Sequence, residues 1–140
     1  MAGQVMSVAR FLELLPHAKA LGMQLDSLGT GEATLSMAYA EHLIGDPVTG
    51  VVHGGAVSAL LDTCCGAAVM SHSSNPAGTA TIDLRIEYLR SATPGERITA
   101  LASCYHITRS VAFVRARALD ADPDRPVAMA TGTFTVGDTR

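Results

Sequence analysis

One acidic residue, Asp62, interrupts a long uncharged part of this sequence. Between Asp46 and Asp83 it is the one side chain with a formal charge, and it follows His53 by nine residues. A carboxylate in such apolar surroundings loses hydration, which raises its pKa and disfavours the charged form. Acids kept in that setting are candidates for catalysis. Asp62 is therefore the first candidate catalytic residue, as a general base for water or as a direct nucleophile.

The turn His53-Gly54-Gly55 offers a second kind of chemistry. A helix that starts at glycines leaves backbone N–H groups unpaired, and its dipole favours negative charge at that end. An oxyanion against the Gly55 N–H would gain typically about 3 kcal/mol of stabilisation. His53 has two readings, since it either orients a substrate or only holds the loop.

Two other chemistries fit the sequence less well. A cysteine and a histidine are the residue types of a nucleophilic pair, and Cys64 or Cys65 with His53 would supply them. Thiols in an apolar helix, however, are usually inert core side chains. Three cysteines, two of them adjacent, do not predict a disulfide framework. The histidines show no metal-ligand spacing, so no metal site is expected.

The composition indicates one globular domain, which we expect to span residues 1–140. Hydrophobic residues make up 48% of the chain and charged residues 16%. A net charge of −3 without a Lys/Arg cluster argues against nucleic-acid binding. No apolar run is long enough to cross a membrane, and the first residues lack a signal-peptide pattern. We therefore expect a cytoplasmic protein.

Hydrophobic periodicity predicts the elements that position these residues. The expected elements are a helix at 7–14 ended by Pro16, a hairpin at 21–40 turning at Gly29-Thr30-Gly31, a loop at 43–52, a main helix at 54–71, and strands at 81–89, 97–109, 111–119 and 126–136. The main helix is apolar on nearly every side, which is typical of a buried helix. Small residues in the last two strands would let a sheet curl around it. The order predicts an α+β fold, an antiparallel sheet wrapped around one helix.

Two segments together resemble the hotdog-fold acyl-CoA thioesterases of the PaaI type. They are GVVHGGAVSALLDTCCGAA and TATIDLRIEYLRSATPGE. The resemblance implies a hotdog fold, a curved antiparallel sheet wrapped around one long central helix. It also implies homodimers or homotetramers with active sites at the dimer interface. The implied activity is hydrolysis of acyl-CoA thioesters to free acid and coenzyme A, without metal or organic cofactor.

The resemblance also assigns roles to particular residues. Asp62 takes the place of the catalytic carboxylate, and His53, Gly54 and Gly55 match the turn that binds the thioester carbonyl. Thr81 matches a position where a hydroxyl residue often lies near the site. Together these residues imply an Asp base or nucleophile facing a backbone-amide oxyanion hole.

Two parts of the expected site are less complete. Many members of the family have an asparagine six residues before the histidine, where it helps to hold the attacking water, and here Pro47 stands there. Either Asp46 substitutes from an inserted loop position, or the water is held otherwise. Among the scattered arginines we expect Arg90 and Arg109 to meet the coenzyme A phosphates.

The sequence leaves two other functions open. A hotdog dehydratase or hydratase would need a different pattern of histidine and acid along the acyl chain. A non-catalytic acyl-CoA-binding hotdog module would bind the ligand without turnover, and Pro47 is compatible with it. Aryl-acetyl, medium-chain and hydroxybenzoyl groups all remain open as the acyl group.

Overall fold

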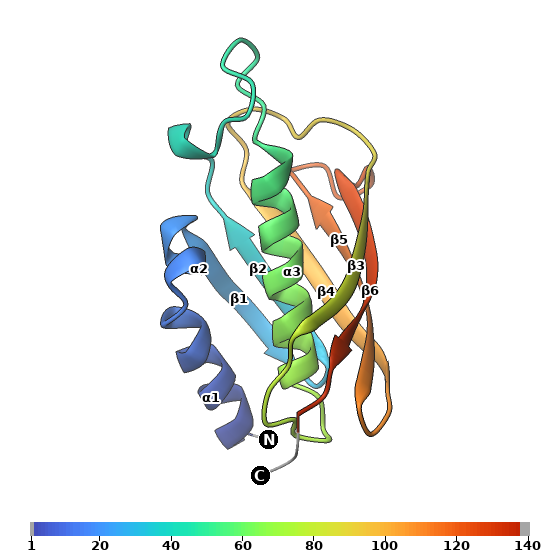
Figure 1. The fold of residues 1–140 in the computed structure, drawn as a ribbon. Coiled ribbons are helices and arrows are strands. Elements are labelled where there is room, and N and C mark those ends of the chain that lie inside the picture. Colours follow the sequence, from blue (N-terminus) through green and yellow to red (C-terminus); the bar gives the residue numbers. More distant parts are fainter. Residues whose placement is uncertain (1, 138–140) are drawn as a thin grey trace.

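The computed structural model describes residues 2–137, with side chains from Val8 onward. In chain order its elements are α1 (Ala2–Glu13), α2 (Pro16–Ala20), β1 (Met23–Gly29), β2 (Glu32–Met37), the 3-10 turn η1 (Glu41–Leu43), α3 (Gly54–Met70), β3 (Thr81–Tyr88), β4 (Ile98–Ile107), β5 (Val111–Leu119) and β6 (Ala128–Thr135). Figure 1 shows α3 in green at the centre of the molecule. Apart from the short α2 and η1, this is the predicted order.

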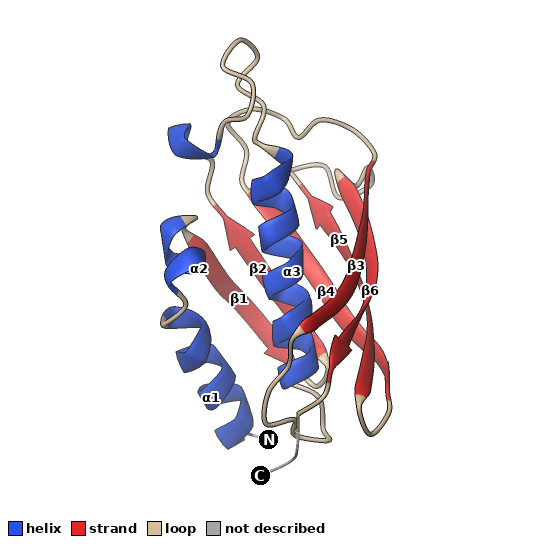
Figure 2. Cartoon of the chain, in the orientation of Figure 1, coloured by secondary structure: helices blue, strands red, loops and turns tan. Residues whose placement is uncertain are grey.

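A single curved sheet contains all the described strands, in the order β1-β2-β4-β5-β6-β3. Each neighbouring pair is antiparallel. The sheet curves around α3, so that β1 and β3 lie at its two edges on either side of the helix (Figure 2). The predicted α+β architecture is confirmed.

Alanines let the sheet approach α3 closely. In β5, Ala112, Ala116 and Ala118 are at most 5% exposed, and in β6 Ala128 and Ala130 are equally buried. Because alanine ends at Cβ, the strand backbones can lie near the helix without leaving voids. On α3 the buried side chains are Ala56, Val57, Leu60, Leu61, Cys64, Cys65, Ala67, Ala68 and Val69. Small residues therefore decide how tightly the sheet wraps.

One face of α3 is left without cover by the sheet. Ser58, Asp62 and Thr63 lie there half-buried, followed one turn later by Gly66. The expectation that the helix is buried on every side therefore needs a correction. The polar residues that interrupt its apolar sequence all lie on the open face.

The N-terminal segment contains two helices where one was predicted. The expected helix at 7–14 belongs to α1, which begins earlier, at Ala2, and ends at Glu13. Pro16 then occupies the first turn of α2, where its missing N–H costs no hydrogen bond. The same proline both separates the helices and starts the second one.

The hairpin predicted around Gly29-Thr30-Gly31 is present as the β1–β2 turn. Gly31 has φ of +70°, a left-handed conformation that glycine adopts without strain. Its carbonyl accepts a hydrogen bond from the Cys104 N–H at 2.8 Å. No helix within residues 2–137 is long and apolar enough to cross a membrane.

Candidate active site

His53 caps the N-terminus of α3 with its own ring. The Gly55 N–H donates to His53 Nδ1 at 2.7 Å. Because a backbone N–H can only donate, Nδ1 must be the unprotonated ring nitrogen, and a neutral ring then carries its proton on Nε2. A Cβ at position 55 would lie 2.8 Å from Nδ1, so a side chain there would push the ring away. The turn depends on glycine at this position.

Gly54 presents the other backbone donor of the turn. Its N–H has no hydrogen-bond acceptor among the residues that the structure describes, and the residue is exposed. Its carbonyl accepts a hydrogen bond from the Tyr88 hydroxyl at 2.8 Å, which ties the helix start to the end of β3. The turn therefore combines a free amide, a positive helix end and a fixed orientation.

The preceding loop holds His53 in place by close backbone contacts. Ile44 and Val52 form an isolated antiparallel bridge, and the His53 N–H donates to the Leu43 carbonyl at 2.7 Å. A Cβ on Gly45 would come within 2.7 Å of the His53 Cα atom. Glycine at position 45 thus permits the close approach that positions the histidine.

Asp62 and Thr81 are brought together across the gap between α3 and β3. The Thr81 hydroxyl donates to Asp62 Oδ1 at 2.6 Å. Asp62 is half-buried, so its desolvation is partial. This hydrogen bond fixes one carboxylate oxygen and leaves Oδ2 without a partner among the described residues.

A β-bulge places Thr81 on the side of the sheet that faces the helix. The pairing of β3 with β6 shifts by one residue between Thr81 and Asp83. Along β3, Leu84 and Ile86 pack on the core, so strict alternation would turn Ile82 inward and Thr81 outward. The bulge reverses this parity, since Thr81 contacts Asp62 while Ile82 is 55% exposed.

Within one chain, the amide turn and the carboxylate are too far apart to act on one carbonyl group. Gly55 and Asp62 are seven residues apart on α3, which is roughly 10 Å along a helix axis. Their angular positions differ by only about 20°, so both lie on the open face. A reacting carbonyl needs both groups at hydrogen-bond distance.

Asp46 is occupied in its own loop. Its carboxylate accepts from the Val48 N–H at 3.0 Å and from the Thr49 hydroxyl at 2.8 Å. These hydrogen bonds, the Thr49 hydroxyl first, hold the pKa of Asp46 below its ordinary value. The loop lies beyond the N-terminal end of α3, whereas Asp62 lies two turns into the helix (Figure 1). The structure does not bring Asp46 to Asp62 within the chain.

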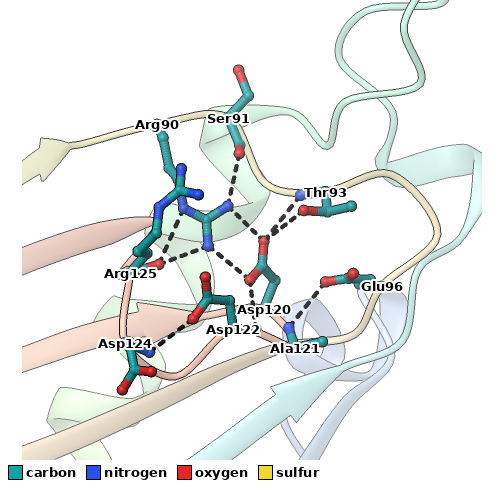
Figure 3. Close-up of polar contacts among 9 residues, drawn as sticks. All are labelled: Arg90, Ser91, Thr93, Glu96, Asp120, Ala121, Asp122, Asp124 and Arg125. Carbon is teal, nitrogen blue, oxygen red and sulfur yellow. Dashed lines mark hydrogen bonds and ion pairs between the residues drawn. The ribbon is translucent and has the colours of Figure 1, made fainter.

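Arg90 forms an ion pair with Asp120, which was not predicted from the sequence (Figure 3). Its Nη1 and Nη2 donate to the two carboxylate oxygens at 2.7 Å each. The remaining N–H groups donate to the carbonyls of Ser91 and Arg125. All five guanidinium donors are thus in use, and Asp120 raises the pKa of Arg90. A phosphate could bind Arg90 only by displacing these partners.

Arg109 lies in the exposed turn between β4 and β5. It has no hydrogen-bond or ion-pair partner among the described residues. Arg90 is held by Asp120 just past the far end of β5, a nine-residue strand that spans about 30 Å. The two arginines therefore lie at opposite ends of the sheet and do not form one phosphate site.

The cysteines do not supply a nucleophile. Cys64 and Cys65 are fully buried against the sheet, and burial raises the pKa of Cys64 to about 12. Burial also raises the pKa of Cys65. The Cys64 thiol donates to the Ala33 and Ala100 carbonyls. All three cysteines lie in the described part of the chain and are free.

Tyr88, like Gly45, is a residue of this site that the sequence analysis did not single out. It belongs to the D-L-x-I-x-Y-L segment on which the resemblance rests. The sequence does not show that this strand ends beside the N-terminus of α3. Alternation along β3 shows the side of the sheet on which Tyr88 lies, whereas its contact with Gly54 depends on how the strand crosses α3.

Known proteins resemble this chain in sequence and in fold. The family model described as "Thioesterase superfamily" matches residues 49–127. The medium/long-chain acyl-CoA thioesterase YigI of Escherichia coli is 30% identical, over 91% of this chain and 89% of that protein. A solved structure from Pseudomonas aeruginosa is 36% identical with a TM-score of 0.83, covering 94% of this chain and 98% of the other.

A further solved structure shows the same fold at lower identity. The PaaI protein from the phenylacetic acid degradation operon of Escherichia coli superposes with a TM-score of 0.86 at 22% identity. The overlap covers 98% of this chain and 96% of that protein. At this identity the likeness concerns the fold alone.

Proposed function

The chain belongs to the thioesterase superfamily as an acyl-CoA thioesterase of the PaaI-type hotdog group, and from that premise we propose that Asp62 acts on a thioester held by the His53-Gly54-Gly55 turn of a second copy. Water adds to the thioester carbonyl, the C–S bond breaks, and free acid and coenzyme A leave. The observation that carries this proposal is the half-buried Asp62 carboxylate, fixed by Thr81 through Oδ1 and open at Oδ2.

Asp62 serves as general base in this scheme. Oδ2 accepts the proton of the attacking water, and Thr81 keeps the carboxylate from rotating away. Direct attack by Oδ2 would form a mixed anhydride and leave the same products. Single-turnover hydrolysis in ¹⁸O-labelled water tests the second route. Label in the Asp62 carboxylate would indicate an anhydride that water opens at the aspartyl carbonyl. Label in the released acid alone would exclude that opening and is the result expected of the base.

The turn supplies the oxyanion hole. The free Gly54 N–H donates to the carbonyl oxygen as negative charge develops there. Without substrate, the Gly55 N–H donates to His53 Nδ1. The oxyanion replaces this ring nitrogen as the acceptor, because a negative oxygen is a stronger acceptor than a neutral ring nitrogen. The positive end of α3 adds to this stabilisation.

Two copies are needed because each has the amide and the acid about 10 Å apart. A two-fold axis across the open faces of two α3 helices would set the Asp62 of each chain against the turn of the other. The exposed edge strand β3 supports such pairing, since Ile82 and Leu89 are more than half exposed beside unpaired strand backbone.

We propose a homodimer as the smallest working unit and a homotetramer of such dimers as the full assembly. The three free cysteines suit a reducing compartment, so the cytoplasm is the proposed location.

Thiol release from a panel of acyl-CoAs tests the activity directly. The wild-type protein should release free coenzyme A from at least one thioester in the panel. Binding of acyl-CoA without any release would refute hydrolysis and favour the non-catalytic module instead.

Mixing two inactive variants tests the shared site. Asp62→Asn removes the acid, and Gly55→Val displaces the His53 ring from the turn. A mixed dimer would contain one intact site, so unfolding and refolding the two variants together should restore about a quarter of wild-type activity. If each chain held a complete site, the mixture would stay as inactive as its parts.

A further inference from the structure

A cavity of about 190 Å³ lies between α1 and the open face of α3, and Asp62 and Thr81 are among the residues that line it. Figure 1 shows α1 beside the C-terminal half of α3. We propose that this cavity holds the acyl group of the substrate and that Gly66 sets how deep the group can enter. This inference rests on the proposed thioester hydrolysis and adds the class of acyl group.

The cavity changes from polar to apolar in the way a thioester does. Asp62 and Thr81 lie at one side, where a carbonyl group reacts. Phe11 and Leu12 of α1 and Met70 of α3 contribute apolar walls. Phe11 is 58% exposed, so the apolar surface continues outward from the cavity mouth. An acyl chain with its carbonyl at Asp62 would find mainly apolar contacts in the cavity.

The other half of the substrate does not fit this cavity. Coenzyme A carries several phosphate charges, and none of the described residues that line the cavity is Lys, Arg or His. Burying phosphates without cationic partners would be strongly unfavourable. The acyl group is therefore the part that enters, and coenzyme A stays outside.

The size of the cavity limits the acyl group. An apolar cavity of about 150 Å³ takes up one benzene molecule, so this one holds roughly six to eight carbon atoms. Beyond Asp62 the described lining offers a polar tail only the Thr79 hydroxyl, which already donates to the Thr135 carbonyl at 2.7 Å, and Met70, two turns beyond Asp62, has no hydroxyl, amide or charge. The cavity thus fits an unsubstituted apolar group, such as octanoyl or phenylacetyl, better than hydroxybenzoyl.

Gly66 lies one turn past Asp62 on the cavity wall. A Cβ there would meet Phe134 Cε2 at 3.8 Å and Thr79 Cγ2 at 3.9 Å, both ordinary contact distances. The position therefore accepts a Cβ atom without rearrangement. Any added side chain occupies space that the acyl group would otherwise fill.

The test compares kcat/KM for acetyl-, butanoyl-, octanoyl-, phenylacetyl- and palmitoyl-CoA. Wild-type protein should prefer octanoyl- or phenylacetyl-CoA. Gly66→Leu should lower the ratio of octanoyl to acetyl activity by about tenfold or more, as loss of pocket space does in other enzymes. Met70→Ala should move the preference toward longer chains. If Gly66→Leu folds poorly, Gly66→Ala should shift the ratio less, in the same direction.

Leu14→Ala is the matched control. Leu14 follows α1, is 71% exposed and does not line the cavity, so its profile should match that of the wild type. If Gly66→Leu and wild type gave parallel profiles across the panel, the assignment of the cavity would be wrong although hydrolysis stands. No thiol release by wild type from any member would instead refute the hydrolysis itself.

Binding of sodium octanoate gives a second readout that needs no turnover. Octanoate should raise the Tm of the wild-type protein, because it binds only the folded chain. Gly66→Leu should lose most of that rise, and Leu14→Ala should keep it. An equal rise in all three proteins would overturn the proposal.

Discussion

Two aspartates in this protein, Asp62 and Asp120, differ in how fully their oxygens are used. The side chain of Asp120 is 1% exposed and accepts from Arg90, from the N–H and hydroxyl of Thr93, and from the Asp122 N–H. Asp62 is half-buried and accepts from the Thr81 hydroxyl alone among the described residues. One carboxylate is saturated, and the other keeps an open oxygen.

The difference separates a carboxylate that stabilises from one that can react. An ionised carboxylate offers about four acceptor positions, and Asp120 has a donor for each. These donors, Arg90 first, hold the pKa of Asp120 well below its ordinary value, so the group stays charged and tied. Asp120 thereby joins the loop after β3 to the loop after β5 (Figure 3). Asp62 has capacity left for a water molecule.

The largest expected effect is on activity at Asp62. Asp62→Asn keeps the shape of the side chain and removes the base, so kcat/KM for thiol release should fall by roughly a thousandfold. The Tm should stay within a few degrees of wild type, since only one hydrogen bond is altered. Stopped-assay kinetics and thermal unfolding measure the two quantities. Retained activity would remove Asp62 from the mechanism.

The same substitution at Asp120 should have the opposite result. Asp120→Asn leaves the Arg90 charge without its partner, and the Tm should fall by roughly 10 °C. Thiol release below the new Tm should remain close to wild type. A stable but inactive Asp120→Asn protein would contradict the contrast between the two carboxylates.

A smaller effect is expected at Thr81. Thr81→Val removes the hydroxyl that positions Asp62 and should lower kcat about tenfold with little change in KM. Thr81→Ser keeps the donor and should restore most of the activity. If Ser and Val behaved alike, packing rather than the hydrogen bond would explain the loss.

The smallest effect concerns acid stability. Because the pKa of Asp120 is depressed in the folded protein, its contribution is present above the unfolded pKa near 4 and is lost as pH falls further. The Tm difference between wild type and Asp120→Asn should therefore be constant from about pH 7 to pH 5 and shrink below about pH 4. Thermal unfolding across pH 2–7 measures this difference in Tm. A difference that grew toward acid pH would show that the pKa of Asp120 is not depressed in the folded protein.

Most of the fold was predictable because each element carries its own pattern. Alternation along 81–89, 97–109, 111–119 and 126–136 predicted the four C-terminal strands within a few residues of β3, β4, β5 and β6. Gly29 and Gly31 marked the hairpin turn, and the apolar run after His53 marked α3. The exception was Pro16, whose local signal fits a helix stop and a helix start equally well.

The candidate site was predictable only in part. Asp62 stood out because no other charge lies near it in the sequence, and the His53-Gly54-Gly55 turn stood out by composition. The ion pair of Arg90 could not be predicted from local spacing, because Asp120 is thirty residues away and the contact depends on how β3 and β5 end. The same holds for Tyr88 and its contact with Gly54.

Local patterns along the chain suffice for the strands, the central helix and the isolation of Asp62, because periodicity and charge spacing are properties of neighbouring residues. The partners of Asp62 depend on the folded chain. A single bulge turns Thr81 toward the helix, and without that one-residue shift in register the same sequence would present Ile82 instead. The sheet's coverage of α3 likewise decides which helix face stays open, and with it where the acid and the cavity lie.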